Sequence, residues 1–154
     1  MRYWLLKSEP DSYSFSDLLA ESRRTTFWNG VRNYQARNFM RDDMKKGDLA
    51  FFYHSGAQPP AIAGIAEIVR EAYPDSSAFD PKSKYFDPKS DPDDPIWVMV
   101  DVKAVKQFDD PISLPELREV KGLDGLELLK RGSRLSIQPV AERHWRIITG
   151  LRKG

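Results

Sequence analysis

The residues best suited to bind a ligand lie between Trp28 and Asn38, in the sequence Trp-Asn-Gly-Val-Arg-Asn-Tyr-Gln-Ala-Arg-Asn. The tryptophan precedes an Asn29–Gly30 turn, and Arg32 and Asn33 follow where a helix is predicted to begin. A planar heterocycle needs a flat apolar surface for its face and amide groups for its edge, and stacking of a base on an aromatic ring contributes roughly 1–3 kcal/mol. The stretch therefore has the chemistry of a nucleobase site, although it also fits a buried Trp28 and a solvent-facing Arg32.

A second stretch, Phe51-Phe52-Tyr53-His54-Ser55, lies at the end of the predicted strand Leu49–His54. Alternation puts Phe52 and His54 on one face of that strand, and Phe51 and Tyr53 on the other. One aromatic set must pack in the core, while the other is available to line a pocket. A histidine there can donate to a ligand, act as a general base or make a structural hydrogen bond, and residue types alone favour the structural role for His54.

Two further stretches carry polar groups. In Lys7-Ser8-Glu9-Pro10, Lys7 and Glu9 share one strand face and are expected to form a solvated pair. Ser8 takes the opposite face, which makes its hydroxyl a candidate pocket group. The stretch 131–139 combines cations, hydroxyls and an amide before a helix, and it either closes one side of a pocket or is an ordinary connection.

The 154-residue chain has a net charge of +1, from 24 basic and 23 acidic residues, so it cannot hold nucleic acid by bulk charge alone. The charge is nevertheless uneven. Acids dominate between Asp87 and Asp110, whereas residues 23–46 contain only Asp42 and Asp43 against the cations Arg23, Arg24, Arg32, Arg37, Arg41, Lys45 and Lys46. A basic side next to a pocket suits a bound polyanion with salt-sensitive affinity, and a plain dipolar surface fits equally well.

Several classes of protein are excluded or disfavoured. The chain has no cysteine, which excludes disulfides, thiolate catalysis and zinc sites built on sulfur. His54 and His144 have no acidic partners at ligand spacing, so we expect no metal site and no cofactor. No phosphate-binding glycine loop, nucleophile elbow or HExxH motif specifies a reaction. No apolar run has the length of a secretory signal or a membrane span, and we expect a cytoplasmic protein.

Hydrophobic patterning predicts a single domain over 1–154 with mixed α and β structure. The expected strands are Tyr3–Leu6, Leu49–His54, Ala61–Tyr73, Trp97–Phe108 and Arg134–Gln138. Five helices are expected. The first starts at Ser14 or Ser16 and ends near Ala20, the second spans Tyr34–Asp42, and the third follows a capping box of Ser113 and Glu116. The fourth spans Leu126–Lys130, and the fifth runs from Pro139 to Leu151. Short connections and a long meander favour a small, mostly antiparallel barrel with helices packed on it.

Three details refine this expectation. Residues 23–26 are predicted to be a polar connection that leads into Phe27 and Trp28. Gly64 within the strand 61–73 indicates a bulge or a close backbone approach. Residues 74–95 hold five prolines, which exclude a continuous helix or central strand, and the aromatic residues Phe79, Tyr85 and Phe86 indicate a packed loop rather than a linker.

Taken together, segments spread in order over nearly the whole chain resemble the EVE domain family, and most of all its bacterial stand-alone members. The resemblance is specific as a combination, although each segment alone is weak. The matching segments are YWLLKSEP at 3–10, WNGVRNYQARN at 28–38, FYHS at 52–55, GIAE at 64–67, AYPD at 72–75, FDPKSKY at 79–85, WVMVDV at 97–102 and RLSIQPV at 134–140.

This resemblance implies an α+β fold, namely a PUA-like, small, mostly antiparallel β-barrel with helices packed around it. It also implies a non-enzymatic nucleic-acid-binding domain that holds a flipped, modified base of DNA or RNA in an aromatic-lined pocket, as a monomer without metal or membrane. The implied phosphate-binding residues are Arg32 and Arg37. The implied pocket residues are Ser8, Trp28, Asn33, Tyr53, His54, Ser55, Ser136 and Gln138. Asn29 departs from the aspartate frequent in this family, which leaves the edge contacts open.

Two alternatives stay open. A hydrolase acting on a modified nucleoside would use Lys7, His54 or Glu67 as acid or base, and an adaptor would bind other proteins through the loop 73–95. The base-reading hypothesis predicts that Trp28→Ala abolishes binding to modified oligonucleotides while thermal stability stays nearly unchanged.

Overall fold

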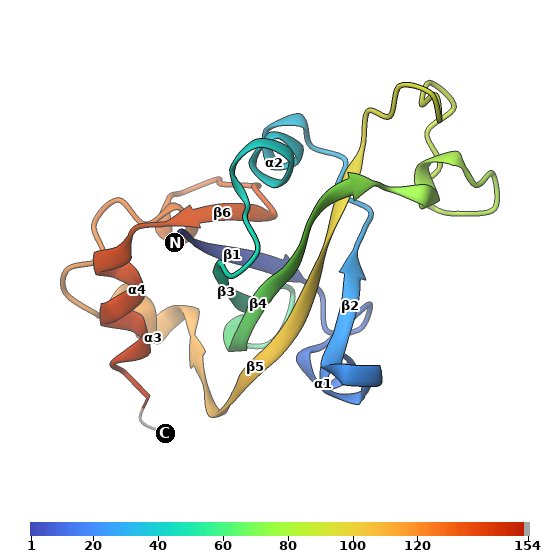
Figure 1. Ribbon diagram of the computed structural model, residues 1–154. Coiled ribbons are helices and arrows are strands. Elements are labelled where there is room, and N and C mark those ends of the chain that lie inside the picture. Colours follow the sequence, from blue (N-terminus) through green and yellow to red (C-terminus); the bar gives the residue numbers. More distant parts are fainter. Residues whose placement is uncertain (153–154) are drawn as a thin grey trace.

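A single twisted sheet of six strands forms the centre of the computed structural model, which describes residues 1–152 (Figure 1). The strand order is β2-β5-β4-β3-β1-β6. Neighbouring strands are antiparallel except β1 and β3, which are parallel. In chain order the strands are β1 Tyr3–Ser8, β2 Thr25–Trp28, β3 Leu49–His54, β4 Ala61–Pro74, β5 Val98–Ser113 and β6 Ile137–Val140.

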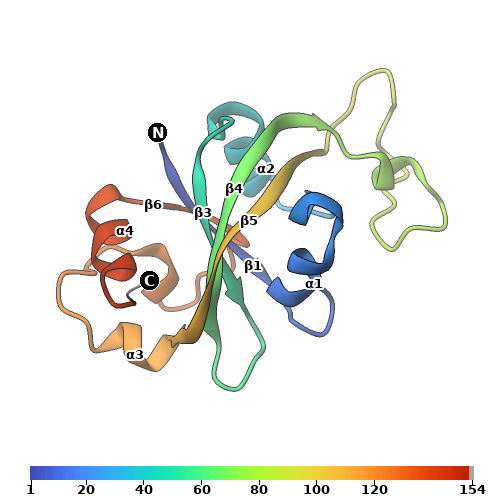
Figure 2. The same cartoon turned by 60° about the horizontal axis from the view of Figure 1, so that its bottom comes forward.

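Helices cover both faces of this sheet (Figure 2). Helices α1 and α2 pack on one face, and α3 and α4 on the other. Their bounds are α1 Phe15–Ala20, α2 Tyr34–Asn38, α3 Leu114–Arg118 and α4 Glu142–Thr149. A π-helical turn, Phe39–Asp43, extends α2, so the helix predicted over 34–42 is confirmed. Nowhere in residues 1–152 is there a helix long and apolar enough to cross a membrane.

Alternation along the strands divides the core in two. In β3, Phe52 points to the α1 side, where its ring meets Phe15 edge-on at 5.3 Å, and His54 lies on the same face at 5.6 Å from Phe52. Phe51 points to the other side and stacks on Trp145 of α4 at 4.0 Å. The predicted alternation of this strand is therefore confirmed, and it sends each aromatic set into one of two cores.

The sheet departs from the predicted barrel. Its first and last strands, β2 and β6, are free edges among the described residues, so hydrogen bonding does not close the sheet and the barrel is not confirmed. The strand β2 replaces the predicted polar connection. Pro139, expected at a helix start, lies instead in β6 opposite Trp4. An edge strand tolerates proline because one side of its backbone needs no partner.

Other local predictions agree with the structure. The register of β4 shifts at Gly64, where an added Cβ would lie 2.5 Å from the carbonyl oxygen of Lys106. The Ser113 hydroxyl accepts a hydrogen bond from the Glu116 amide and begins α3, which is one half of the predicted capping box. The proline-rich loop between β4 and β5 extends beyond the end of the sheet (Figure 1) and is anchored at Ala78, which is fully buried, and at Tyr85, which is half-buried.

Candidate functional site

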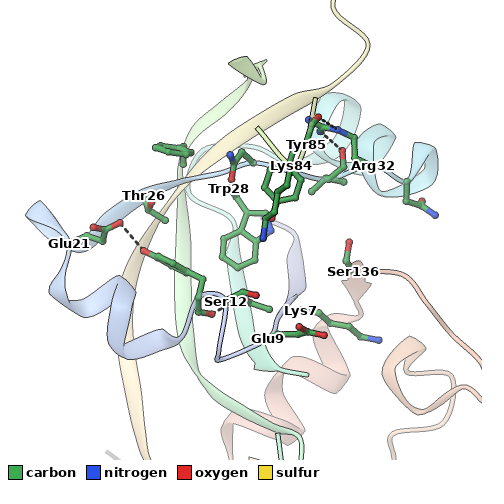
Figure 3. A pocket seen from close by; sticks show the side chains of 17 residues that line it. Lys7, Glu9, Ser12, Glu21, Thr26, Trp28, Arg32, Lys84, Tyr85 and Ser136 are labelled. Atoms are coloured by element: carbon green, nitrogen blue, oxygen red, sulfur yellow. Dashed lines mark hydrogen bonds between the residues drawn. The ribbon is translucent and has the colours of Figure 1, made fainter. Parts of the chain in front are cut away.

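A cavity of about 640 Å³ opens on the α1 side of the sheet, where four distant parts of the chain meet (Figure 3). The first is the end of β1 with the turn that follows. The second is β2 with its connection to α2, the third is the part of the proline-rich loop that holds Lys84 and Tyr85, and the fourth is Ser136, just before β6. The lining residues are 7–9, 12, 13, 21, 26–33, 84, 85 and 136. A volume of this size is typical of sites that take small molecules or single nucleotides.

Trp28 belongs both to the core and to the cavity wall. Its side chain is 9% exposed, and its ring packs edge-on against Phe52 at 5.4 Å and 89°. The remaining exposed part of the indole lines the cavity. The indole is therefore accessible to a ligand, but the expectation that Trp28→Ala leaves stability nearly unchanged does not agree with this burial.

Five of the residues predicted for the site do line the cavity: Ser8, Trp28, Arg32, Asn33 and Ser136. The Ser8 hydroxyl donates to the carbonyl oxygen of Tyr13 at 2.6 Å, which ties the end of β1 to the next turn. The Asn33 side-chain oxygen accepts from the Ala36 amide at 2.9 Å and caps α2. The cap leaves the amide nitrogen of the exposed Asn33 side chain available to a ligand.

Five other predicted residues do not line it: Arg37, Tyr53, His54, Ser55 and Gln138. Tyr53 is 3% exposed in the core on the α4 side. His54 Nε2 accepts a hydrogen bond from the Phe15 amide at 3.0 Å, which is the structural role that residue types favoured, and burial lowers the pKa of His54. Gln138 is 1% exposed and donates to the Leu135 carbonyl. Because β3 is a central strand, its side chains fill the two cores.

Arg32 reaches inward. All five N–H groups of its guanidinium have acceptors within the chain. Nε and Nη2 donate to the carbonyl oxygen of Tyr85 at 3.1 and 2.6 Å, and Nη2 also reaches the Ser77 hydroxyl at 3.5 Å. Nη1 donates to the Val31 carbonyl at 2.9 Å and to the Asp75 carboxylate at 3.1 Å. In this arrangement Arg32 has no free N–H group left for the predicted contact with a phosphate.

Arg37 lies differently. Its Nε donates to the Asn38 side chain at 2.9 Å and its Nη1 to the Ile96 carbonyl at 3.0 Å, so two of its five N–H groups are used. The guanidinium lies 5.1 Å from the centre of the Tyr34 ring, which is 58% exposed. Arg37 therefore keeps donors for a phosphate outside the cavity.

Sequence reasoning missed several lining residues. Lys7, expected in a solvated pair with Glu9, lines the cavity, and burial lowers the pKa of its ammonium group, an effect that Glu127 partly opposes. The Tyr13 hydroxyl donates to the Glu21 carboxylate at 3.0 Å, and burial, with this carboxylate, raises the pKa of Tyr13 to about 12. No spacing rule places these groups next to Trp28, because they meet only through tertiary packing.

The three residues that a hydrolase would use as acid or base do not lie together in the structure. Lys7 lines the cavity, whereas His54 lies outside it and Glu67 lies in the middle of β4, opposite Leu49 and Lys103. Across residues 1–152, no group of three histidine or acidic side chains is placed to hold a metal ion.

Comparison with known proteins gives the family. The EVE domain model matches residues 2–151. Human thymocyte nuclear protein 1 is 42% identical over 168 aligned positions, which cover 98% of this chain and 74% of that protein. The crystal structure of human THYN1 protein in complex with DNA containing 5-methylcytosine superposes with a TM-score of 0.94 at 42% identity, over 100% of this chain and 99% of that one. A crystal structure from Pseudomonas syringae gives 0.91 at 46% identity, over 98% and 99%. This chain belongs to the EVE domain family.

Proposed function

We propose that this chain binds DNA that carries a modified base, and that it holds this base, turned out of the helix, in the Trp28 cavity. The observation that carries the proposal is an indole edge-packed in the core with its remaining surface turned to a cavity of about 640 Å³. A similar protein, human THYN1, has been crystallised with DNA containing 5-methylcytosine. That structure makes 5-methylcytosine the first base to test.

The groups around the indole suit the edge of a base. Glu9 and Glu21 bring carboxylates to the cavity, and a carboxylate accepts from the exocyclic amino group of cytosine. Ser136 and Asn29 add a hydroxyl and an amide, which both donate and accept. Lys7 and Lys84 line the same cavity and add donors, so the lining offers both donors and acceptors to the edge of a base.

The energies set what binding can achieve. Turning a base out of a duplex costs a few kcal/mol, and stacking on Trp28 returns roughly 1–3 kcal/mol. A buried methyl group adds only about 0.8 kcal/mol, which corresponds to about fourfold discrimination between 5-methylcytosine and cytosine. We therefore expect weak binding that falls as salt rises, with a modest preference for the methylated base.

The test is a titration of labelled duplexes that differ only in one cytosine or 5-methylcytosine, followed by fluorescence polarisation. A 2-aminopurine next to the target in the same strand reports unstacking, and the same sequences as RNA compare the two nucleic acids. We expect tighter binding of the methylated DNA together with an unstacking signal. Binding of neither duplex contradicts the proposal, and equal binding without unstacking contradicts base recognition. Chromatography of the digested probe detects any altered nucleoside, which would favour the hydrolase alternative.

A further inference from the structure

The start of the proline-rich loop is fixed next to the β2–α2 connection by one buried carboxylate. Asp75 is fully buried, and its Oδ2 accepts both from the Gly30 amide at 2.9 Å and from Arg32 Nη1 at 3.1 Å. Its Oδ1 accepts from the amide and the hydroxyl of Ser77. Both carboxylate oxygens are thus occupied, so the Asp75–Arg32 pair is satisfied within the protein.

The ring of Tyr85 lies directly over Gly30. A Cβ built on Gly30 would lie 2.5 Å from the Tyr85 ring, and the φ of Gly30 is +80°, so only glycine gives both the turn and the close approach. Arg32 donates twice to the carbonyl oxygen of Tyr85 itself. The guanidinium therefore sets the position of the residue whose ring meets the cavity.

We propose that Tyr85 is a second aromatic wall of the base cavity, and that Arg32 is the positioning residue that holds it there rather than a phosphate contact. Two observations carry this inference: Tyr85 and Trp28 line one cavity, and all five N–H groups of Arg32 are used inside the chain. The stacking role of Tyr85 rests on the proposed function. The positioning role of Arg32 rests on the geometry alone.

Binding measurements separate a wall from a phosphate contact. The probe is a duplex with one 5-methylcytosine, titrated over a range of salt. Tyr85→Ala is expected to weaken binding roughly 5- to 150-fold, the loss of one stacking contact, and Tyr85→Phe to bind like the wild type because the ring remains. Arg32→Lys keeps the charge but cannot satisfy the same acceptors, so it is expected to weaken binding without changing the salt slope. The double variant is expected to be no weaker than Tyr85→Ala, since Arg32 acts through Tyr85.

The opposite results are equally definite. Wild-type affinity in Tyr85→Ala overturns the proposal that Tyr85 is a wall of the base cavity. Wild-type affinity in Arg32→Lys, together with a salt slope lowered by about 1 in Arg32→Gln, makes Arg32 a phosphate contact and overturns the positioning role.

Hydrogen exchange of the free protein tests the positioning role without DNA. Exchange of residues 76–90 is expected to be faster in Arg32→Lys and unchanged in Arg41→Lys, since Arg41 is an exposed arginine paired with its neighbour Asp42. Unchanged exchange in Arg32→Lys overturns the positioning role. A wild-type protein that does not bind the probe overturns the proposed function and the stacking role of Tyr85, while exchange still decides the role of Arg32.

Discussion

Replacing Trp28 with alanine is expected to lower both stability and DNA affinity, because the same indole serves the core and the cavity. The side chain is 9% exposed and meets Phe52 edge-on at 5.4 Å. Truncating a buried tryptophan costs about 3–5 kcal/mol, from lost burial and the space left behind. For a domain of this size, about 2–4 °C of melting temperature is lost per kcal/mol, so a decrease of about 6–20 °C is expected.

The affinity must then be separated from the stability. Only folded molecules bind, so the apparent dissociation constant of a partly unfolded protein equals the intrinsic one divided by the folded fraction, and it is multiplied by that fraction to recover the intrinsic value. Binding is measured well below the melting transition of the variant, and the folded fraction is taken from circular dichroism under the same conditions. After this correction Trp28→Ala is expected to bind roughly 5- to 150-fold more weakly, because the stacking surface is gone. Trp28→Phe keeps a smaller ring and is expected to lie between.

Trp145→Ala is the matched control. Trp145 is 6% exposed and stacks on Tyr3 at 4.6 Å and on Phe51 at 4.0 Å, in the core on the opposite face of the sheet. Its loss is expected to destabilise the fold by a similar amount and to leave the corrected affinity unchanged. If the folded fraction accounts for the whole loss of affinity in Trp28→Ala, or if both variants lose corrected affinity equally, the indole is only a core residue and the reasoning is refuted.

Three further predictions address Phe27 at the edge of the cavity, a phosphate contact of Arg37, and the pH dependence of stability. Phe27 is 54% exposed at the cavity, so Phe27→Ala is expected to change stability by less than about 0.5 kcal/mol and to weaken binding at least about fivefold. Phe86→Ala, which removes a 40% exposed ring outside the cavity lining, is expected to bind like the wild type. Equal loss of affinity in Phe27→Ala and Phe86→Ala would refute a contact between Phe27 and the DNA. Arg37→Gln is expected to lower the salt slope by about 1 for methylated and unmethylated DNA alike, and an unchanged slope excludes a phosphate contact. Burial lowers the pKa of His54 below 6.5, so the unfolded chain takes up the proton first as pH falls. The stability from its bond with Phe15 is then complete above pH 6.5 and is lost between that value and the lower folded pKa. Thermal melts from about pH 8 to about pH 5 check this, and an identical pH profile in His54→Gln contradicts it.

The fold was predictable where apolar residues recur with a clear period. The strand over 49–54, the long strand from Ala61 and the helix over 34–42 all follow from such patterns. The strand β2 was not predictable. It is a four-residue edge strand that follows Arg23 and Arg24, both with positive φ, and no propensity predicts two such arginines in succession. The closure of a sheet also depends on how far it twists, which the strand pattern alone does not give.

The site was predictable only in part, because contacts between segments far apart in sequence do not follow from local patterns. Trp28, Ser8 and Ser136 were chosen by residue type and by resemblance, and they do meet at one cavity. Alternation correctly placed Phe52 and His54 on one strand face, but it could not say that this face belongs to a closed core. Tyr85 was recognised as an aromatic anchor in a loop, but its position over Gly30 depends on the Asp75–Arg32 pair, which joins segments far apart in sequence.

The rigidity of the cavity follows from these same contacts and bears on how it can bind. A protein that accepts an extruded base gains from stacking about what extrusion costs, so little binding energy remains for ordering its own walls. In this chain the walls are ordered before any ligand arrives: Phe52 packs against the indole of Trp28, and Arg32 and Asp75 fix the loop that carries Tyr85. Preorganisation of this kind lowers the entropic cost of binding. Changes at Asp75, which lies outside the lining and accepts from Gly30 and Arg32, should therefore weaken binding as much as changes to the lining itself.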